Sequence, residues 1–176
     1  GEIVLEDVNV SEQSILPNVS GLKGPFGCLS RARYGISWGA MGAAEYCWHV
    51  ARQYGLDRKQ FGKPIVDFQA VQVQLAEIKM KLDASRLLLY RAVVNADKDL
   101  PYIADSSIAK CYANEVAREI TGKCVQLMGG YGYSKEYPIE QKMRDAWGWG
   151  IAGGSIDIQK TNITSALIGR RFNQRN

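Results

Sequence analysis

The sequence is poor in histidine and has no clustered cysteines. His49 is the single histidine, and the four cysteines, Cys28, Cys47, Cys111 and Cys124, form no Cys-x-x-Cys pair. This spacing matches neither zinc nor dithiol redox sites, so we predict no metal site. His49 lies in the middle of an expected helix and no nucleophile pattern points to it, so we interpret it as structural. Cysteines scattered through apolar helical contexts indicate reduced, buried thiols in a reducing compartment.

Long apolar runs, phosphate-loop motifs and strong charge are also absent. No apolar run reaches transmembrane length and no signal-peptide pattern occurs, so we predict no transmembrane segment. The P-loop motif is missing, as is a Gly-x-Gly-x-x-Gly after a strand, which excludes P-loop and Rossmann interpretations. The net charge of +4 is mild, which argues against nucleic acid as a partner. We interpret the basic cluster Arg170, Arg171 and Arg175 as a solvated tail.

Glycine, by contrast, is abundant, and four glycines crowd into a short stretch: Gly148, Gly150, Gly153 and Gly154. We expect a loop here, followed by Ser155 as the N-cap of a final helix. A glycine turn before a capped helix offers unpaired N–H groups and the positive end of the helix dipole. Two interpretations stay open: a flexible connection between helices, or a loop folded against a bound cofactor or acyl group.

The remaining sequence has the apolar periodicity of long helices, and 176 residues suit one domain. The pattern predicts helices over residues 28–56, 67–98, 101–128, 137–146 and 156–172. Residues 1–10 alternate weakly and are predicted to form a strand. Because a lone strand is not stable, we expect its partner strands to lie outside this sequence. The predicted fold class is all-α, an antiparallel four-helix bundle preceded by one strand.

Two polar side chains at predicted helix ends are candidate ligand contacts. Arg58 lies where the first long helix stops, and either satisfies the last carbonyls or binds a pyrophosphate through its guanidinium fork. Gln126 precedes Gly129 and Gly130, so a helix-end amide lies next to backbone without side chains. For both residues the structural and the binding interpretations stay open. Gly35, Gly39 and Gly42, inside the first helix, indicate either close packing against another helix, the commoner cause, or close approach of a ligand.

Four motifs together resemble the acyl-CoA dehydrogenases. In chain order they are Ala32-Arg33-Tyr34-Gly35-Ile36, Arg58-Lys59-Gln60-Phe61-Gly62, Gln126-Leu127-Met128-Gly129-Gly130-Tyr131-Gly132-Tyr133 and Met143-Arg144-Asp145-Ala146. The resemblance spans essentially the whole chain, aligned to the C-terminal half of a typical member, and residues 24–54 are most similar to glutaryl-CoA dehydrogenase. It implies that residues 1–27 are the end of a middle β-domain, otherwise missing, and a linker. Residues 28–176 would be the C-terminal helical bundle domain.

The resemblance also implies a cofactor, a substrate and partners. The cofactor is FAD, and the substrate is an acyl-CoA thioester. The chain would form a homo- or hetero-oligomer, a dimer of dimers that places FAD between two subunits. Electron-transfer flavoprotein is a further partner. The matching FAD positions are Arg58, Gln60 and Phe61 across the dimer, Gln126 and Gly130 toward the partner's FAD, and Ser155 and Asp157 after the catalytic loop. Arg33 matches an arginine near the CoA and acyl chain. The family's location is the mitochondrial matrix or the bacterial cytoplasm.

The two positions that carry the catalytic base in this family are vacant. Dehydrogenation requires a carboxylate that removes the α-proton of the thioester. Gly153 and Ala32 occupy the two matching positions, so no catalytic residue is assigned. Three explanations stay open. Another carboxylate serves, either from the missing N-terminal half or from this chain, where Asp157 and Glu45 are the nearest. Alternatively, the chemistry differs, or the protein is inactive. The leading hypothesis is an FAD-dependent dehydrogenase of short or dicarboxylic acyl-CoA. The alternative is an inactive structural or assembly subunit of a hetero-oligomeric complex.

Overall fold

The protein is a helical bundle with a projecting N-terminal segment. The computed structural model describes residues 1–98, 100, 103–170 and 172. The helices are α1 (Lys23–Asp57), α2 (Gln69–Asp97), α3 (Ile103–Met128), α4 (Gly130–Tyr133), α5 (Ile139–Ile151) and α6 (Ile156–Ile168). Two short strands, β1 (Lys59–Gln60) and β2 (Lys63–Pro64), form a hairpin, and 3-10 turns span Glu12–Ser14 and Ile65–Asp67.

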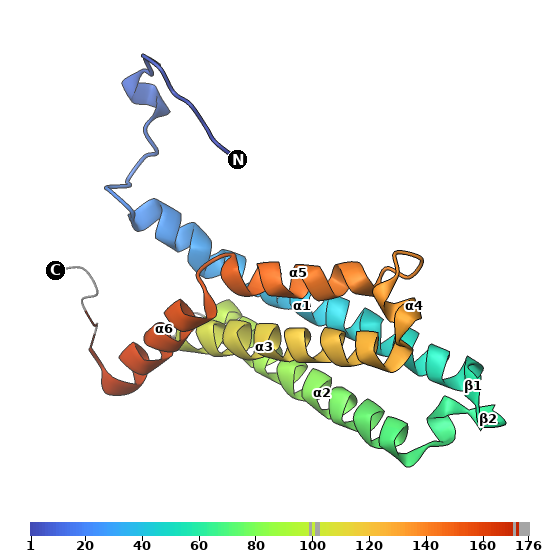
Figure 1. Ribbon diagram of the computed structural model, residues 1–176. Helices are drawn as coiled ribbons and strands as arrows, with labels where there is room; N and C mark the ends of the chain where they lie inside the picture. Colours follow the sequence, from blue (N-terminus) through green and yellow to red (C-terminus); the bar gives the residue numbers. More distant parts are fainter. Residues whose placement is uncertain (99, 101–102, 171, 173–176) are drawn as a thin grey trace.

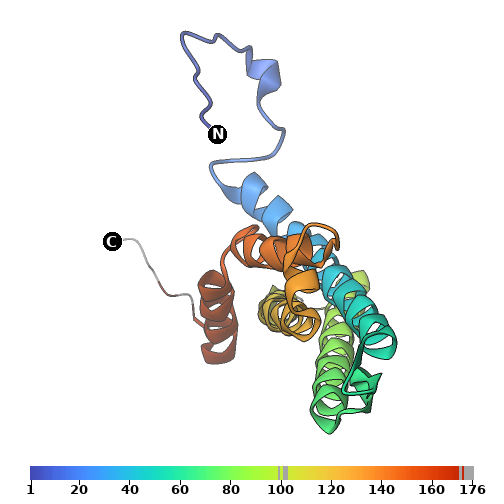
Figure 2. The same ribbon diagram turned by 45° about the vertical axis from the view of Figure 1, so that its right-hand side comes forward.

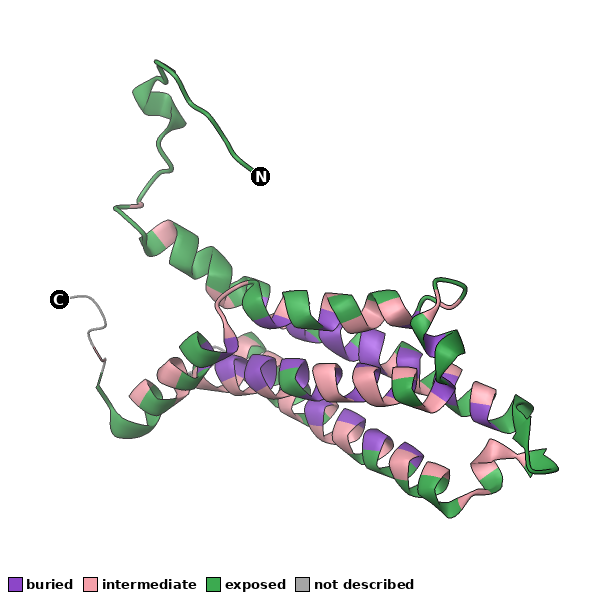
Figure 3. Ribbon diagram, in the orientation of Figure 1, coloured by how far each residue is buried: buried purple, intermediate pink, exposed green. Residues whose placement is uncertain are grey.

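Helix α3 is the centre of the bundle, because it packs against α1, α2, α5 and α6. Along the chain, α1, α2, α3 and α5 alternate in direction, while α6 lies at an angle at one end (Figures 1 and 2). This arrangement confirms the predicted antiparallel helical bundle. Buried residues gather on the inner faces of α1, α2 and α3 (Figure 3).

The contact between α1 and α3 is built from small side chains. Ala40, Ala44 and Cys47 on α1 belong to the same buried cluster as Ala113 and Ala117 on α3. Small side chains let the two helix backbones approach closely. Glycine does not play this part: at the three α1 glycines predicted to pack, an added Cβ would meet nothing within 4 Å. The prediction of glycine-mediated packing within this chain was therefore wrong.

The N-terminal segment does not form the predicted strand. Over residues 1–10 no strand is present, and every one of these residues is exposed (Figure 3). A strand needs a neighbour to satisfy its backbone N–H and C=O groups, and no other described segment offers one here. The predicted division at residue 27 stays a prediction, and α1 begins before it, at Lys23. Pro25 is tolerated in the first turn, where its missing N–H would have no partner anyway.

Two helix ends differ from the sequence prediction. Helix α5 was expected to stop near residue 146, but it continues through Gly148 and Gly150 to Ile151. Arg118 explains this extension, because its guanidinium donates to the Ala146 and Trp147 carbonyls at 3.4 and 3.1 Å. A Cβ at Gly150 would overlap that guanidinium, so glycine makes room for it.

Helix α6 was expected to reach residue 172, but it ends at Ile168, where Gly169 adopts a left-handed conformation. Residue 101, the expected start of one helix, and Arg171 and Arg175 of the basic cluster lie outside the described residues.

Candidate functional site

The predicted binding residues divide between two opposite ends of the bundle. The first, here called the hairpin end, comprises the β1–β2 hairpin and the junction of α3 with α4. The second, the turn end, comprises the turn between α5 and α6 and the α1 and α3 residues next to it. Figure 1 shows the hairpin at one extremity and α6 at the other.

At the hairpin end, Phe61 has an unusual backbone conformation. Lys59 pairs with Pro64 and Gln60 with Lys63, so Phe61 and Gly62 form the two-residue turn. Both have positive φ, 52° for Phe61 and 80° for Gly62. Glycine and asparagine suit such a turn, whereas a bulky residue there is strained. Phe61 is nevertheless 92% exposed, with only an edge contact to the Phe68 ring at 6.2 Å. A strained, exposed aromatic side chain is typical of a binding feature.

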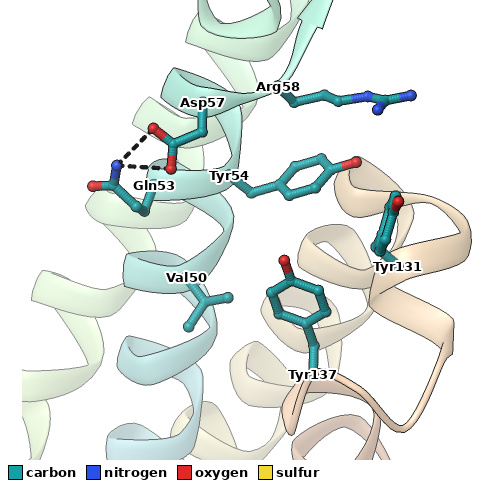
Figure 4. A pocket seen from close by; sticks show the side chains of 7 residues that line it. All are labelled: Val50, Gln53, Tyr54, Asp57, Arg58, Tyr131 and Tyr137. Carbon is teal, nitrogen blue, oxygen red and sulfur yellow. Dashed lines mark hydrogen bonds between the residues drawn. The ribbon is translucent and has the colours of Figure 1, made fainter.

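Next to the hairpin, Arg58 borders two adjoining clefts. One has a volume of about 430 Å³, and Figure 4 shows Tyr54, Tyr131 and Tyr137 around it with Arg58 at its rim. The other, of about 440 Å³, is lined by Arg58, Tyr54, Tyr131 and the backbone of Gly129 and Gly130. The fold thus brings Arg58 and Gly130 together, as the binding interpretation requires.

The tyrosines are the part of the hairpin end that sequence reasoning missed. The ring of Tyr131 lies 6.1 Å from those of both Tyr54 and Tyr137. Gln60 and Gln126 are exposed and line neither cleft. Gly129 has φ 60° and ψ −135°, a conformation essentially restricted to glycine. Other residues do not adopt this conformation readily, so the backbone at Gly129 carries no side chain.

The turn end is organised by two glycines and the N-cap of α6. Gly153 and Gly154 both have positive φ, 64° and 93°. Ser155 caps α6, because its hydroxyl accepts a hydrogen bond from the Ile158 N–H at 3.4 Å, which confirms the predicted cap. Asp157 is exposed in the first turn of α6, where a carboxylate complements the helix dipole. The predicted loop is thus a tight turn, since Gly148 and Gly150 belong to α5.

A buried lysine lies directly beneath this turn. Lys110 of α3 is 0% exposed, and its Nζ donates to the Gly154 carbonyl at 2.6 Å. Gln159 Nε2 donates to the same carbonyl at 3.0 Å. Burial, with a smaller contribution from Arg33, lowers the pKa of Lys110 to about 8. Sequence reasoning missed Lys110, although it lies on the same helical stripe as Ala113, a position where a lysine is out of place.

Arg33 is also buried at the turn end. It is 9% exposed, burial lowers the pKa of its guanidinium, and its Nε has no hydrogen-bond partner. It lines a cleft of about 620 Å³ between the start of α1 and α6, together with Ser30, Ile158 and Thr161. A buried guanidinium with an unpaired N–H at a cleft is suited to an anionic or strongly polar ligand.

Of the two predicted acidic candidates, Glu45 is paired with an arginine, and Asp157 is exposed in the first turn of α6. Glu45 faces α2, where it accepts a hydrogen bond from Arg86 at 2.6 Å, so its carboxylate is already paired. Ala32 is exposed on α1. A side chain at Gly153 would overlap Ile36 and come within 3.9 Å of Lys110 Cε. The structure therefore leaves the proton acceptor unassigned.

Two kinds of feature are absent from the described residues, a membrane-spanning helix and a cluster of metal ligands. In this part of the chain, no helix combines the length and the apolar character needed to cross a membrane. Over the same ranges, no three histidine, cysteine, aspartate or glutamate side chains gather as a metal site would require. His49 is exposed, and its ring meets the Trp48 ring edge-on at 4.9 Å.

Most of the chain matches one known protein family. The family model described as "Acyl-CoA dehydrogenase, C-terminal domain" matches residues 20–168. The chain is 40% identical over 167 residues to the mitochondrial short/branched chain specific acyl-CoA dehydrogenase of Rattus norvegicus, covering 94% of this chain and 39% of the relative. It is 37% identical over 168 residues to the Caffeyl-CoA reductase-Etf complex subunit CarC of Acetobacterium woodii, covering 95% of this chain and 44% of the relative.

Solved structures give the same result. Butyryl-CoA dehydrogenase from Megasphaera elsdenii superposes with a TM-score of 0.82 at 38% identity, covering 84% of this chain and 39% of that one. A glutaryl-CoA dehydrogenase from Mycobacterium smegmatis in complex with FADH2 superposes with a TM-score of 0.85 at 28% identity, covering 90% and 41%. The chain thus spans about two fifths of the length of the relatives it matches.

Proposed function

The chain belongs to the acyl-CoA dehydrogenase family, through the family's C-terminal domain, and from this we propose that it takes part in the α,β-dehydrogenation of an acyl-CoA with FAD. The observation that carries the proposal is the cleft in which Arg58 faces the bare backbone of Gly129 and Gly130. A guanidinium fork beside backbone that carries no side chains lets a phosphate-bearing cofactor approach closely.

The residues present fit FAD at both ends of the bundle. When bound, FAD supplies the acceptor for the hydride that leaves the β-carbon of the thioester. We propose that the hairpin end holds its phosphate and adenosine part through Arg58, Gln60, Phe61, Gln126 and Gly130, and that Ser155 and Asp157 contact it at the turn end.

The two sets of residues lie at opposite ends of the bundle, one beyond each end of helix α5. Helix α5, with 13 residues, spans about 20 Å between the hairpin end and the turn end. We therefore propose that FAD lies between two subunits, meeting the hairpin end of one and the turn end of the other.

A second surface supports an oligomer. Apolar side chains recur every seven residues along the outer face of α2, at Val73, Met80, Leu87 and Val94, and they are 52%, 72%, 69% and 46% exposed. Such a stripe is typical of a helix that packs against a partner helix. We propose a homo-oligomer, in the family's dimer of dimers, that covers this stripe. A hetero-oligomer stays the alternative.

At the turn end, we propose that Arg33 binds the acyl-CoA, with a short or dicarboxylic acyl chain as the substrate class. Its buried guanidinium lines the 620 Å³ cleft and has an N–H without a partner. A group outside the positions of Gly153 and Ala32 must accept the α-proton, or the reaction differs from simple dehydrogenation.

Electron-transfer flavoprotein is the proposed electron acceptor, because the Acetobacterium woodii relative is named as a subunit of an Etf complex. The proposed location, mitochondrial matrix or bacterial cytoplasm, follows from relatives of both kinds.

A second candidate function is an inactive structural subunit. The observation that favours it is the absence of an ionisable side chain at Gly153 and at Ala32. Such a subunit would keep the fold and its contacts with other subunits without catalysing proton removal.

The visible spectrum of the purified protein, before and after anaerobic addition of short acyl-CoAs including glutaryl-CoA, tests the proposal. A flavin spectrum that bleaches is expected for a working dehydrogenase. A flavin spectrum that persists with every thioester would favour the inactive subunit. Absence of flavin would contradict the enzyme proposal altogether.

A further inference from the structure

The turn between α5 and α6 contains two residues of the type that can adopt the most backbone conformations. Gly153 and Gly154 are consecutive and both have positive φ. Glycine has the widest choice of backbone angles, so two in succession need contacts from elsewhere to fix one conformation. Two side-chain donors, Lys110 and Gln159, meet at the Gly154 carbonyl.

Of these donors, Lys110 bonds to Gly154 and lies close to Gly153. Its Nζ donates to the Gly154 carbonyl at 2.6 Å, and its Cε lies 3.9 Å from the point where a Gly153 Cβ would be. A charged donor in a buried site makes a hydrogen bond stronger than a neutral one. Lys110 is thus the side chain best placed to fix the turn.

The surroundings of Lys110 do not compensate its charge. Lys110 is 0% exposed and takes part in none of the ion pairs of the described residues. The charged groups that act on it are two further cations, Arg33 from α1 and Arg118 from its own helix, besides the Cys111 thiol. From α6 it meets the neutral Gln159, whose amide bonds the same carbonyl. An apolar side chain of similar length would fill this space at a lower free energy.

We propose that Lys110 is a positioning residue, which fixes the Gly153–Gly154 turn through the Gly154 carbonyl and is retained there in spite of its destabilising effect on the domain. The assignment of acyl-CoA chemistry to this turn rests on the proposed function. The contact between Lys110 and the turn does not, because it involves only residues of this chain.

Hydrogen exchange of the purified protein, followed by mass spectrometry, tests this role. In Lys110→Met, the amides that are hydrogen-bonded on either side of the turn, Ala152 to the Gly148 carbonyl and Ile158 to the Ser155 hydroxyl, are expected to exchange at least about tenfold faster at pH 7, while amides of the α1–α3 core are unchanged or slower. Lys123→Met is the matched control, because Lys123 lies on the same helix but pairs with Glu77 and Glu119 at the surface. It should leave exchange in the turn unchanged.

The pH dependence of hydrogen exchange in the turn distinguishes a positioning role of Lys110 from a general effect on the stability of the domain. Protection of the turn in the natural protein, corrected for intrinsic exchange, should fall between pH 7 and 9.5 as Lys110 loses its proton. In Lys110→Met it should be low at both values. Unchanged turn exchange in this variant, or equal acceleration of turn and core, would overturn the proposal. Should the variant not fold, pH-independent protection in the natural protein would overturn it equally.

Flavin content, measured in the same samples, distinguishes the two proposals. Its absence would contradict the proposed function and leave the exchange result for Lys110 intact.

Discussion

The buried side chain of Lys110 makes the free energy of unfolding depend on pH, and both the direction and the size of this dependence can be predicted. Burial lowers the pKa of Lys110 from 10.5 to about 8 in the folded protein. Between these two values the unfolded chain binds a proton that the folded protein does not. The free energy of unfolding therefore rises with pH across this window. One pKa unit corresponds to about 1.4 kcal/mol, so the full rise is about 3 kcal/mol.

Other groups titrate in part of the same window. Burial raises the pKa of the Cys47 thiol to about 12, and the pKa of Cys124 is raised as well. In the unfolded chain these thiols lose their protons near pH 9, so they lower stability above that value. The difference between the natural protein and Lys110→Met cancels the contributions of Cys47 and Cys124, because Lys110 does not act on either thiol.

The assay is denaturant unfolding of both proteins at half-unit steps from pH 7 to 10.5. At pH 7 we expect Lys110→Met to be more stable by about 1–3 kcal/mol, because it removes a buried charge without a counter-charge, and Gln159 still donates to the Gly154 carbonyl. The advantage should vanish as pH approaches 10.5. A variant less stable than the natural protein at pH 7, or an advantage that does not change with pH, would refute the reasoning.

Three further predictions concern the other features. Phe61→Asn relieves about 1–2 kcal/mol of left-handed strain and loses about 0.5–1.5 kcal/mol of contact with Phe68. By thermal unfolding it should be as stable as the natural protein or more so, yet by absorbance it should contain less flavin; unchanged flavin content would contradict a role in binding. Gly150→Ala displaces the Arg118 guanidinium and should destabilise by about 1 kcal/mol in denaturant unfolding, because the lost bonds outweigh the gain in helix propensity. The control Gly148→Ala, in open space on the same helix, should stabilise by about 1 kcal/mol, and equal effects would refute the role of Arg118. Met80→Glu with Leu87→Glu should lower the mass measured by light scattering without loss of helix content, and an unchanged mass would contradict an interface on α2.

The sequence predicted most of the helices and one cap, and it failed where distant segments decide. Ser155 was recognisable as an N-cap because capping depends on residues that are adjacent in the chain. The strand over residues 1–10 was not formed, because strand formation depends on a neighbouring strand. The end of α5 was placed too early, because Gly148 and Gly150 have low helix propensity, and the residue that compensates, Arg118, is about thirty positions away.

In the candidate site, too, the sequence predicted what depends on residues close together in the chain and missed what depends on distant segments. Arg58, Gly130, Arg33 and the vacant position at Gly153 could be named from motifs, since those motifs are local.

By itself, the sequence determined the helical periods, the family and the chemistry that each motif offers, because these depend on residue type and short spacing. Only the tertiary structure decided which of these residues meet. It joined Arg58 to Gly130 at one end, and it buried Lys110 under the glycine turn at the other. The physical reason is that burial and pairing of charge depend on segments brought together by packing, and no spacing along the chain records them.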